Sequence, residues 1–144
     1  MEKERFFKIL AKAPAEDVKK LADSFIKKND IMIVKEPEKS LAMIKVREPV
    51  KESLFYLGEV IICESEIVLN GQFHGKAVTA GEDLKKVLHM AVIDACVNAG
   101  IFHDEEVLLE MEKQQQLQEE KEQALYYKTK VDFQSMDSES KTLD

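Results

Sequence analysis

The spacing of apolar side chains changes along the chain and predicts helices first, strands next and helices again. Residues 2–12 and 15–28 place apolar side chains three and four positions apart, which is typical of helices with one apolar stripe. Pro14 suits the start of the second helix, because its fixed φ angle matches the first helical turn. The first thirty residues are therefore predicted to form a helical hairpin.

From Asp30 onward the period shortens to two, as in strands. Residues 31–34 form a short β-rich run that Glu36 and Pro37 end, and residues 41–47 alternate up to Pro49. Residues 54–69 are too long for one flat strand. We therefore expect a bulge or bend near Gly58 and another at residues 64–66.

Asn70 and Gly71 predict a tight type I′ hairpin turn, because both residue types tolerate the positive φ angles that this turn needs. The returning strand starts near Phe73 and includes Gly75. Gly81 ends it.

Residues 82–99 predict a helix that is apolar on most of its circumference and is therefore buried. Glu82 and Asp83 suit its first turn, and Gly100 suits its C-terminal cap. The fold class predicted from these elements is α+β. It comprises an N-terminal helical hairpin, an antiparallel sheet with a tight hairpin, the buried helix 82–99 packed on the sheet, and a projecting C-terminal helix.

The last quarter of the chain differs in kind. Its helical pattern is apolar for two turns after Asp104 and then polar through residues 113–123, before apolar residues return. We predict a single α+β domain over 1–103, and a C-terminal helix with an acidic, partly mobile tail over 104–144. A helix that is polar all round is expected to project from the body or to reach another chain.

Charge and composition narrow the range of partners. The net charge is −7, and all of the excess lies in residues 104–144, which hold 12 acidic and 5 basic side chains, whereas residues 1–103 hold 16 of each. Such a chain is a poor ligand for nucleic acid or an anionic membrane, and a partner with a basic face fits better. No apolar run approaches the length of a membrane span, and the charged start lacks the core of a secretory signal, so we expect a cytoplasmic protein.

A search for reactive groups predicts no catalytic residue, no metal site and no cofactor. The three histidines and two cysteines form no close ligand pair, and the five glycines form no phosphate-binding loop. Buried free thiols are the expected state of Cys63 and Cys96. Asp94, on the most apolar helix, is interpreted as half of a structural ion pair with a cation such as Arg47, ahead of a catalytic role.

A set of residues in a fixed order resembles a known family. The set is Arg47, Phe55, Gly58-Glu59, Asn70-Gly71, Gly75, Gly81, Asp83, Asp94-Ala95 and Lys130-Val131-Asp132-Phe133, and Arg5-Phe6-Phe7 with Leu10-Ala11 fits the family's opening. The family is PhnG, a small subunit of the bacterial carbon–phosphorus lyase system. The resemblance covers nearly the whole chain.

The resemblance implies a role in phosphonate catabolism, within a core assembly with PhnI, PhnH and PhnJ. With PhnI, PhnH and PhnL, the family supports transfer of an alkylphosphonate to the ribose of ATP with release of adenine, and PhnI is regarded as the catalytic subunit. We therefore expect structural or interface roles for the matching positions, namely Arg47, Gly58, Glu59, Gly71, Gly75, Gly81, Asp83, Asp94, Val131, Asp132 and Phe133.

The chain also departs from the family pattern. Glu64, Glu82 and the segment after Phe133 replace three family arginines. Two alternatives stay open beside the subunit hypothesis. One is a stand-alone binder or enzyme with a pocket near Asp94 that uses Glu59 or His89, and the other is a homo-oligomer that buries residues 126–133.

Overall fold

A computed structural model describes the backbone of residues 2–142 and the side chains of residues 2–129. The elements in chain order are α1 (Lys3–Lys12), α2 (Ala15–Ile26), β1 (Ile31–Arg47), β2 (Leu54–Leu69), β3 (Phe73–Ala80), α3 (Leu84–Asn98) and α4 (Glu105–Thr142). The chain divides into two compact units at Glu105 and Glu106. The predicted α+β class is confirmed.

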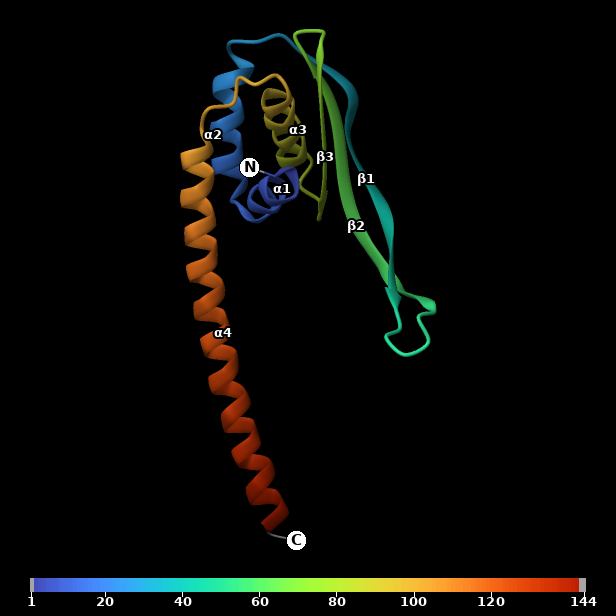
Figure 1. Cartoon of the computed structure of the whole chain (residues 1–144), viewed down its shortest axis with the longest axis vertical. Coiled ribbons are helices and arrows are strands. Elements are labelled where there is room, and N and C mark those ends of the chain that lie inside the picture. Colours follow the sequence, from blue (N-terminus) through green and yellow to red (C-terminus); the bar gives the residue numbers. More distant parts are fainter. Residues whose placement is uncertain (1, 143–144) are drawn as a thin grey trace. The chain divides into compact units, whose positions relative to one another are not determined.

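The sheet has three antiparallel strands in the order β1-β2-β3 (Figure 1). β1 and β2 pair along their whole length, from Ile31 opposite Leu69 to Arg47 opposite Leu54. β3 is half as long and pairs with β2 from Leu69 only as far as Ile62. The outer parts of β1 and β2 therefore continue as a two-stranded ribbon, which Figure 1 shows extending away from the helices of its unit.

β1 is one strand, which corrects the prediction of two runs separated at Pro37. The register shifts twice between Ile33 and Glu38, so β1 carries extra residues opposite Glu64 and Glu66. Bulges on an edge strand tolerate proline, since its nitrogen has no hydrogen to donate to the ladder. A third shift, where Ile44 pairs with Gly58 and Lys45 with Tyr56, confirms the irregularity expected near Gly58.

The turn between β2 and β3 has the expected backbone. Asn70 and Gly71 have φ angles of 53° and 67°. The N–H of Gln72 donates to the carbonyl of Leu69 at 3.1 Å. Two consecutive positive φ angles are what a type I′ turn requires.

α3 lies in the core, and both of its ends are capped. The side chain of Asp83 accepts from the N–H of Lys86 at 3.0 Å. Past the last turn Gly100 has a φ of 73°, and Ile101 N–H donates to the carbonyl of Cys96. These are the features of a Schellman ending.

The predicted helical hairpin is present and packs on α3. α1 buries Phe6, Ile9 and Leu10, and α2 buries Val18, Leu21 and Ala22. Contacts join α2 to α3, and α3 to β2 and β3. The core of this unit thus lies between the helical hairpin, α3 and one face of the sheet, as Figure 1 shows.

α4 is a single helix of 38 residues, longer than the pattern predicted, since it continues to Thr142. Val107, Leu109, Leu117 and Leu125 are exposed. The predicted motif Val131, Asp132 and Phe133 lies outside the residues whose side chains are described.

Candidate functional site

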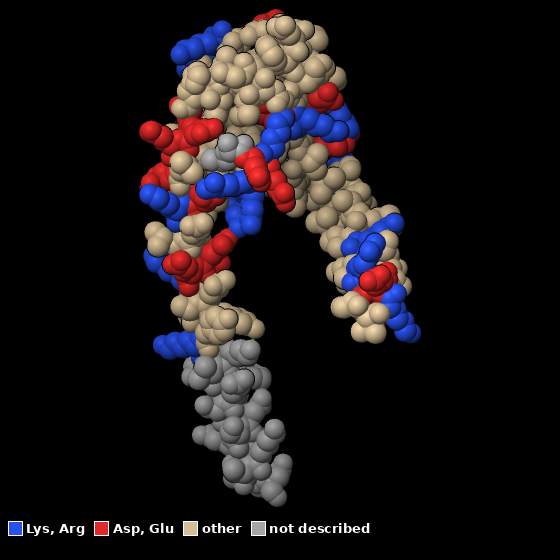
Figure 2. Space-filling view, viewed as in Figure 1, with Lys and Arg blue, Asp and Glu red and all other residues tan. Residues whose placement is uncertain are grey.

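The two-stranded ribbon formed by residues 41–61 carries the largest group of exposed apolar side chains. We call it the hairpin arm. It consists of the end of β1, a six-residue turn and the start of β2. Figure 2 shows that its upper part carries few charged side chains on the face in view and that charged side chains of both signs gather near its tip.

Both faces of the hairpin arm are apolar. The face that continues from buried Cys63 carries Leu41 and Met43, which are 63% and 60% exposed. The opposite face carries Ile44 and Phe55, which are 39% and 47% exposed. The assignment follows from strand alternation and from the register, in which Leu41 pairs with Ile61.

We name the two faces by their residues. The inner face, continuous with the side of the sheet that α3 covers, comprises Leu41, Met43, Lys45, Arg47, Leu54, Tyr56, Glu59 and Ile61. The outer face comprises Ala42, Ile44, Val46, Phe55, Gly58, Val60 and Ile62. The inner face therefore mixes apolar and charged side chains, whereas the outer face carries no charge.

Tyr56 and Glu59 interact across the inner face. A hydrogen bond to Glu59, together with a smaller effect of burial, raises the pKa of the Tyr56 phenol. No described side chain pairs with Lys45 or Arg47. The turn at the tip adds Lys51 and two carboxylates, Glu48 and Glu52, but neither carboxylate forms an ion pair with Lys45 or Arg47.

Asp94 holds three elements together. The residue is 5% exposed, and its Oδ2 accepts from the backbone N–H of Lys76 at 3.0 Å. Its buried Oδ1 lies 3.4 Å from Nζ of Lys3 in an ion pair but has no hydrogen-bond partner among the described residues. The cation is thus Lys3 of α1. The suggested partner Arg47 lies on the hairpin arm opposite Leu54 instead, which corrects that suggestion.

Gly75 lies beside Asp94 at the contact between β3 and α3. A Cβ atom at Gly75 would come within 2.1 Å of the Ala91 carbonyl oxygen and 2.7 Å of the Ala95 Cβ. The strand therefore approaches the helix backbone too closely for any side chain. Together with the Asp94 contacts, this packing gives Gly75 and Asp94 structural roles.

The other predicted positions are scattered. Gly71 and Gly81 have positive φ angles in turns, and Asp83 caps α3. Arg47, Gly58 and Glu59 all lie on the hairpin arm. The structure therefore places these three predicted positions on one element, with Gly58 on its outer face and Arg47 and Glu59 on its inner face, and it brings Gly75 and Asp94 together at the contact between β3 and α3.

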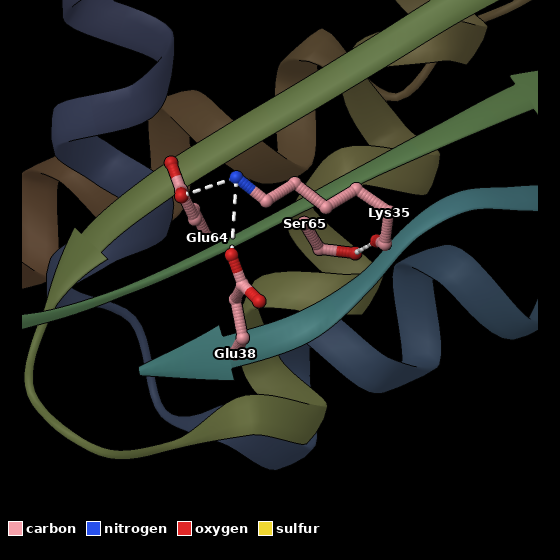
Figure 3. A network of polar contacts seen from close by, with 4 residues as sticks. All are labelled: Lys35, Glu38, Glu64 and Ser65. Atoms are coloured by element: carbon pink, nitrogen blue, oxygen red, sulfur yellow. Dashed lines mark hydrogen bonds and ion pairs between the residues drawn. The ribbon is translucent and has the colours of Figure 1, made fainter. Parts of the chain in front are cut away.

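A polar network joins β1 and β2 (Figure 3). Its charged groups lie on the side of the sheet that α3 does not cover, whereas Ser65 is buried. Nζ of Lys35 binds Oε1 of Glu64 and lies 3.1 Å from Oε1 of Glu38, while Ser65 Oγ donates to the Lys35 carbonyl at 3.1 Å. The hydrogen bond from Lys35 lowers the pKa of Glu64, and the same bond raises the pKa of Lys35. The charge of Glu64 is thus neutralised within the chain.

Neither thiol is placed for nucleophilic chemistry. Both are buried, and burial raises the pKa of Cys96 to about 11. Burial and the charge of Asp83 raise the pKa of Cys63. A thiolate is the reactive form, so both cysteines are unreactive in the folded chain.

The described residues contain no group of histidine, cysteine and carboxylate side chains that could hold a metal ion. Over the same part of the chain, no helix combines the length and apolarity needed to cross a bilayer. Burial lowers the pKa of His89, and the charges acting on it belong to Asp23, Lys19, Asp83 and Lys85. His89 is thus influenced by groups of α2, α3 and the α3 cap.

The exposure of the hairpin arm is not predicted by the alternation of residues 41–47, which indicates a strand but not what covers it. Two signals were available, namely the run Leu41-Ala42-Met43-Ile44, which puts apolar residues on both faces, and the difference in length between residues 54–69 and the returning strand.

Comparison with protein families places the chain beside proteins of phosphonate metabolism. The family model described as phosphonate metabolism protein PhnG matches residues 1–137. No protein with a curated description matches the chain at a significant level.

Proposed function

Because the chain belongs to the PhnG family of phosphonate metabolism proteins, we propose that it is a non-catalytic subunit of a carbon–phosphorus lyase core complex in the cytoplasm. It supports the transfer of an alkylphosphonate to the ribose of ATP, with release of adenine. Its partners are PhnI-, PhnH- and PhnJ-type subunits. The observation that carries the proposal is the family match over residues 1–137.

The fate of the candidate reactive groups supports a non-catalytic role. The Asp94 carboxylate accepts a hydrogen bond from the Lys76 amide and forms an ion pair with Lys3, Glu64 binds Lys35, and both thiols are buried. What the chain offers to its surroundings is apolar surface on a hairpin arm. That is a property of a protein that binds other proteins.

Co-expression tests the proposal. The chain is expressed with PhnI-, PhnH-, PhnJ- and PhnL-type proteins, and size-exclusion chromatography shows whether it co-elutes with them. Adenine release from ATP and methylphosphonate is then measured for the PhnI, PhnH and PhnL types with this chain, without it, and for the chain alone.

We expect co-elution, and adenine release only when the chain and its partners are combined. A chain that elutes alone at every salt concentration would contradict the proposed subunit role. Adenine release by the purified chain alone would contradict the non-catalytic role.

A further inference from the structure

We propose that the hairpin arm is the docking element of this chain, and that its occupant is a different protein with an apolar cleft that encloses both faces of the arm and has acidic side chains where it meets the tip. The inference rests on the proposed function, since it names the surface and the chemistry by which the subunit binds its partner.

The first argument is the cost of leaving the arm in water. A two-stranded hairpin is marginally stable in water unless a third strand or a helix covers it. Beyond Ile62 no described strand pairs with the free edge of β2, and the large apolar side chains stand open to solvent. A partner that covered the arm would remove this cost.

The second argument is area. The exposed large apolar residues of the arm and its turn are Leu41, Met43, Ile44, Val46, Val50, Leu54, Phe55, Tyr56, Leu57 and Ile61. Together they expose on the order of 1,000 Å² of surface, compared with roughly 800 Å² per partner in a typical specific interface. The area on the two faces and the turn together is sufficient for a stable contact.

The third argument distinguishes a different protein from a second copy. A two-fold contact places one patch against its own copy. Stacking two arms through one face would leave the other face in water, and both faces carry side chains such as Met43 and Phe55 that are about half exposed or more. A cleft covers both faces at once.

The fourth argument is charge. Lys45 and Arg47 lie on the inner face near the tip, and no described side chain neutralises them. Glu59, the acidic residue of that face, lies nearer the body of the sheet. The turn's own carboxylates, Glu48 and Glu52, form no ion pair with these two cations. Burying unpaired cations is costly, so we expect the cleft to supply carboxylates there.

Binding measurements with full-length variants test each face separately. The inner-face variant carries Leu41→Asp and Met43→Asp, and the outer-face variant carries Ile44→Asp and Phe55→Asp. The control carries Met32→Asp and Val34→Asp, which lie on β1 outside the arm and are 60% and 52% exposed. Affinity for purified PhnI-, PhnH- and PhnJ-type proteins is measured one protein at a time, and circular dichroism checks folding.

We expect each arm variant to bind one of these proteins at least about 30-fold more weakly, which is the size of a hot-spot effect, while the control stays within about threefold of the unmodified chain. Weaker binding by only one of the two arm variants would overturn the proposal that the cleft encloses both faces. Wild-type affinity in both arm variants would overturn the arm as docking element and leave the proposed function standing.

Two further outcomes separate the remaining explanations. If the unmodified chain binds none of the three proteins, the proposed function fails, and this inference fails with it. If light scattering shows that the unmodified chain is a dimer and that the arm variants are monomers, the occupant is a second copy and the inference is overturned.

The charge argument has its own test. Reversing the cations with Lys45→Glu and Arg47→Glu should weaken binding at least tenfold at low salt, and added salt should narrow the difference from the unmodified chain, since screening weakens charge interactions. Unchanged affinity in this variant would overturn the proposal that the cleft has acidic side chains near the tip of the arm.

Discussion

At the scale of single residues, the contact between β3 and α3 depends on a glycine, which has no side chain, and on a charged carboxylate. Gly75 lets the strand approach the helix backbone, and Asp94 then reaches the N–H of Lys76 on the same strand. Lys3 adds a counter-charge from α1. These contacts hold β3 against α3 and α1.

Gly75→Ala should therefore destabilise the fold strongly. The new Cβ would lie 2.1 Å from the Ala91 carbonyl oxygen and 2.6 Å from the Ala95 nitrogen, so strand and helix must separate. We expect a loss of about 3 kcal/mol in the free energy of unfolding, at the upper end of typical overpacking effects. Urea unfolding measures it.

Gly58→Ala is the matched control for Gly75→Ala. No atom lies within 4 Å of a Cβ added at Gly58, and its φ angle is not in the left-handed region. The control should unfold within about 0.5 kcal/mol of the unmodified chain, as most surface substitutions do. Equal effects of the two substitutions would show that Gly75 is not required for close packing.

His89 should make stability depend on pH. Burial lowers its pKa in the folded chain below the ordinary value of 6.5. The unfolded chain therefore binds a proton at a higher pH than the folded chain, and the free energy of unfolding falls as the pH drops from 6.5 toward the folded pKa. His89→Gln should lose less stability over this range.

The measurement for His89 is urea unfolding of both proteins at a series of pH values from 7.5 to 5. The difference between their free energies of unfolding isolates the contribution of His89, because the carboxylates titrate in both proteins. Parallel curves for the two proteins would mean that the folded and unfolded pKa values of His89 are equal.

At the scale of elements, local chemistry predicted the helices and turns well. The Asn70-Gly71 turn, the Asp83 cap and the Gly100 ending each depend on a residue's own conformational preference, which the sequence carries directly. Pairing between strands is not local. The sequence around Pro37 indicated a break, yet bulges on an edge strand absorb the proline.

The exposure of the hairpin arm could not be predicted either, because it also depends on contacts between residues far apart in the sequence. Whether alternating residues face a core depends on which elements cover them. β3 ends at Ala80 and pairs with β2 no farther than Ile62, so nothing in the same unit extends the sheet along the arm. The candidate site was therefore predicted in part, through Arg47, Gly58 and Glu59, but its apolar character was not.

Hydrogen exchange should distinguish the arm from the rest of the sheet. Backbone amides of residues 41–47 and 54–60 should exchange faster in the isolated chain than those of residues 62–69, because a two-stranded ribbon opens at lower free energy than a strand packed on both sides. Mass spectrometry of peptides from the labelled chain resolves the two regions. Equal protection would show that the arm is stable without a partner.

At the scale of the whole molecule, the chain offers two surfaces of different character, one in each unit. The hairpin arm is apolar and carries cations near its tip, whereas described α4 is acidic, with exposed Leu125, Tyr126 and Tyr127 following its polar stretch. Aromatic side chains of this kind are enriched at protein interfaces. An alternative raised by the sequence is that residues 126–133 join copies of this chain.

Truncation after Gln123 decides between a homo-oligomer and a subunit that binds other proteins. If Leu125, Tyr126 and Tyr127 contact a different protein, the isolated full-length chain is a monomer, and so is the truncated chain. The truncated chain should then bind its partner at least about tenfold more weakly, since buried aromatic anchors carry much of the affinity of an interface. Light scattering gives the oligomeric state, and titration against the PhnI-, PhnH- and PhnJ-type proteins gives the affinity. A full-length dimer that becomes monomeric on truncation would instead assign these residues to contacts between copies of the chain.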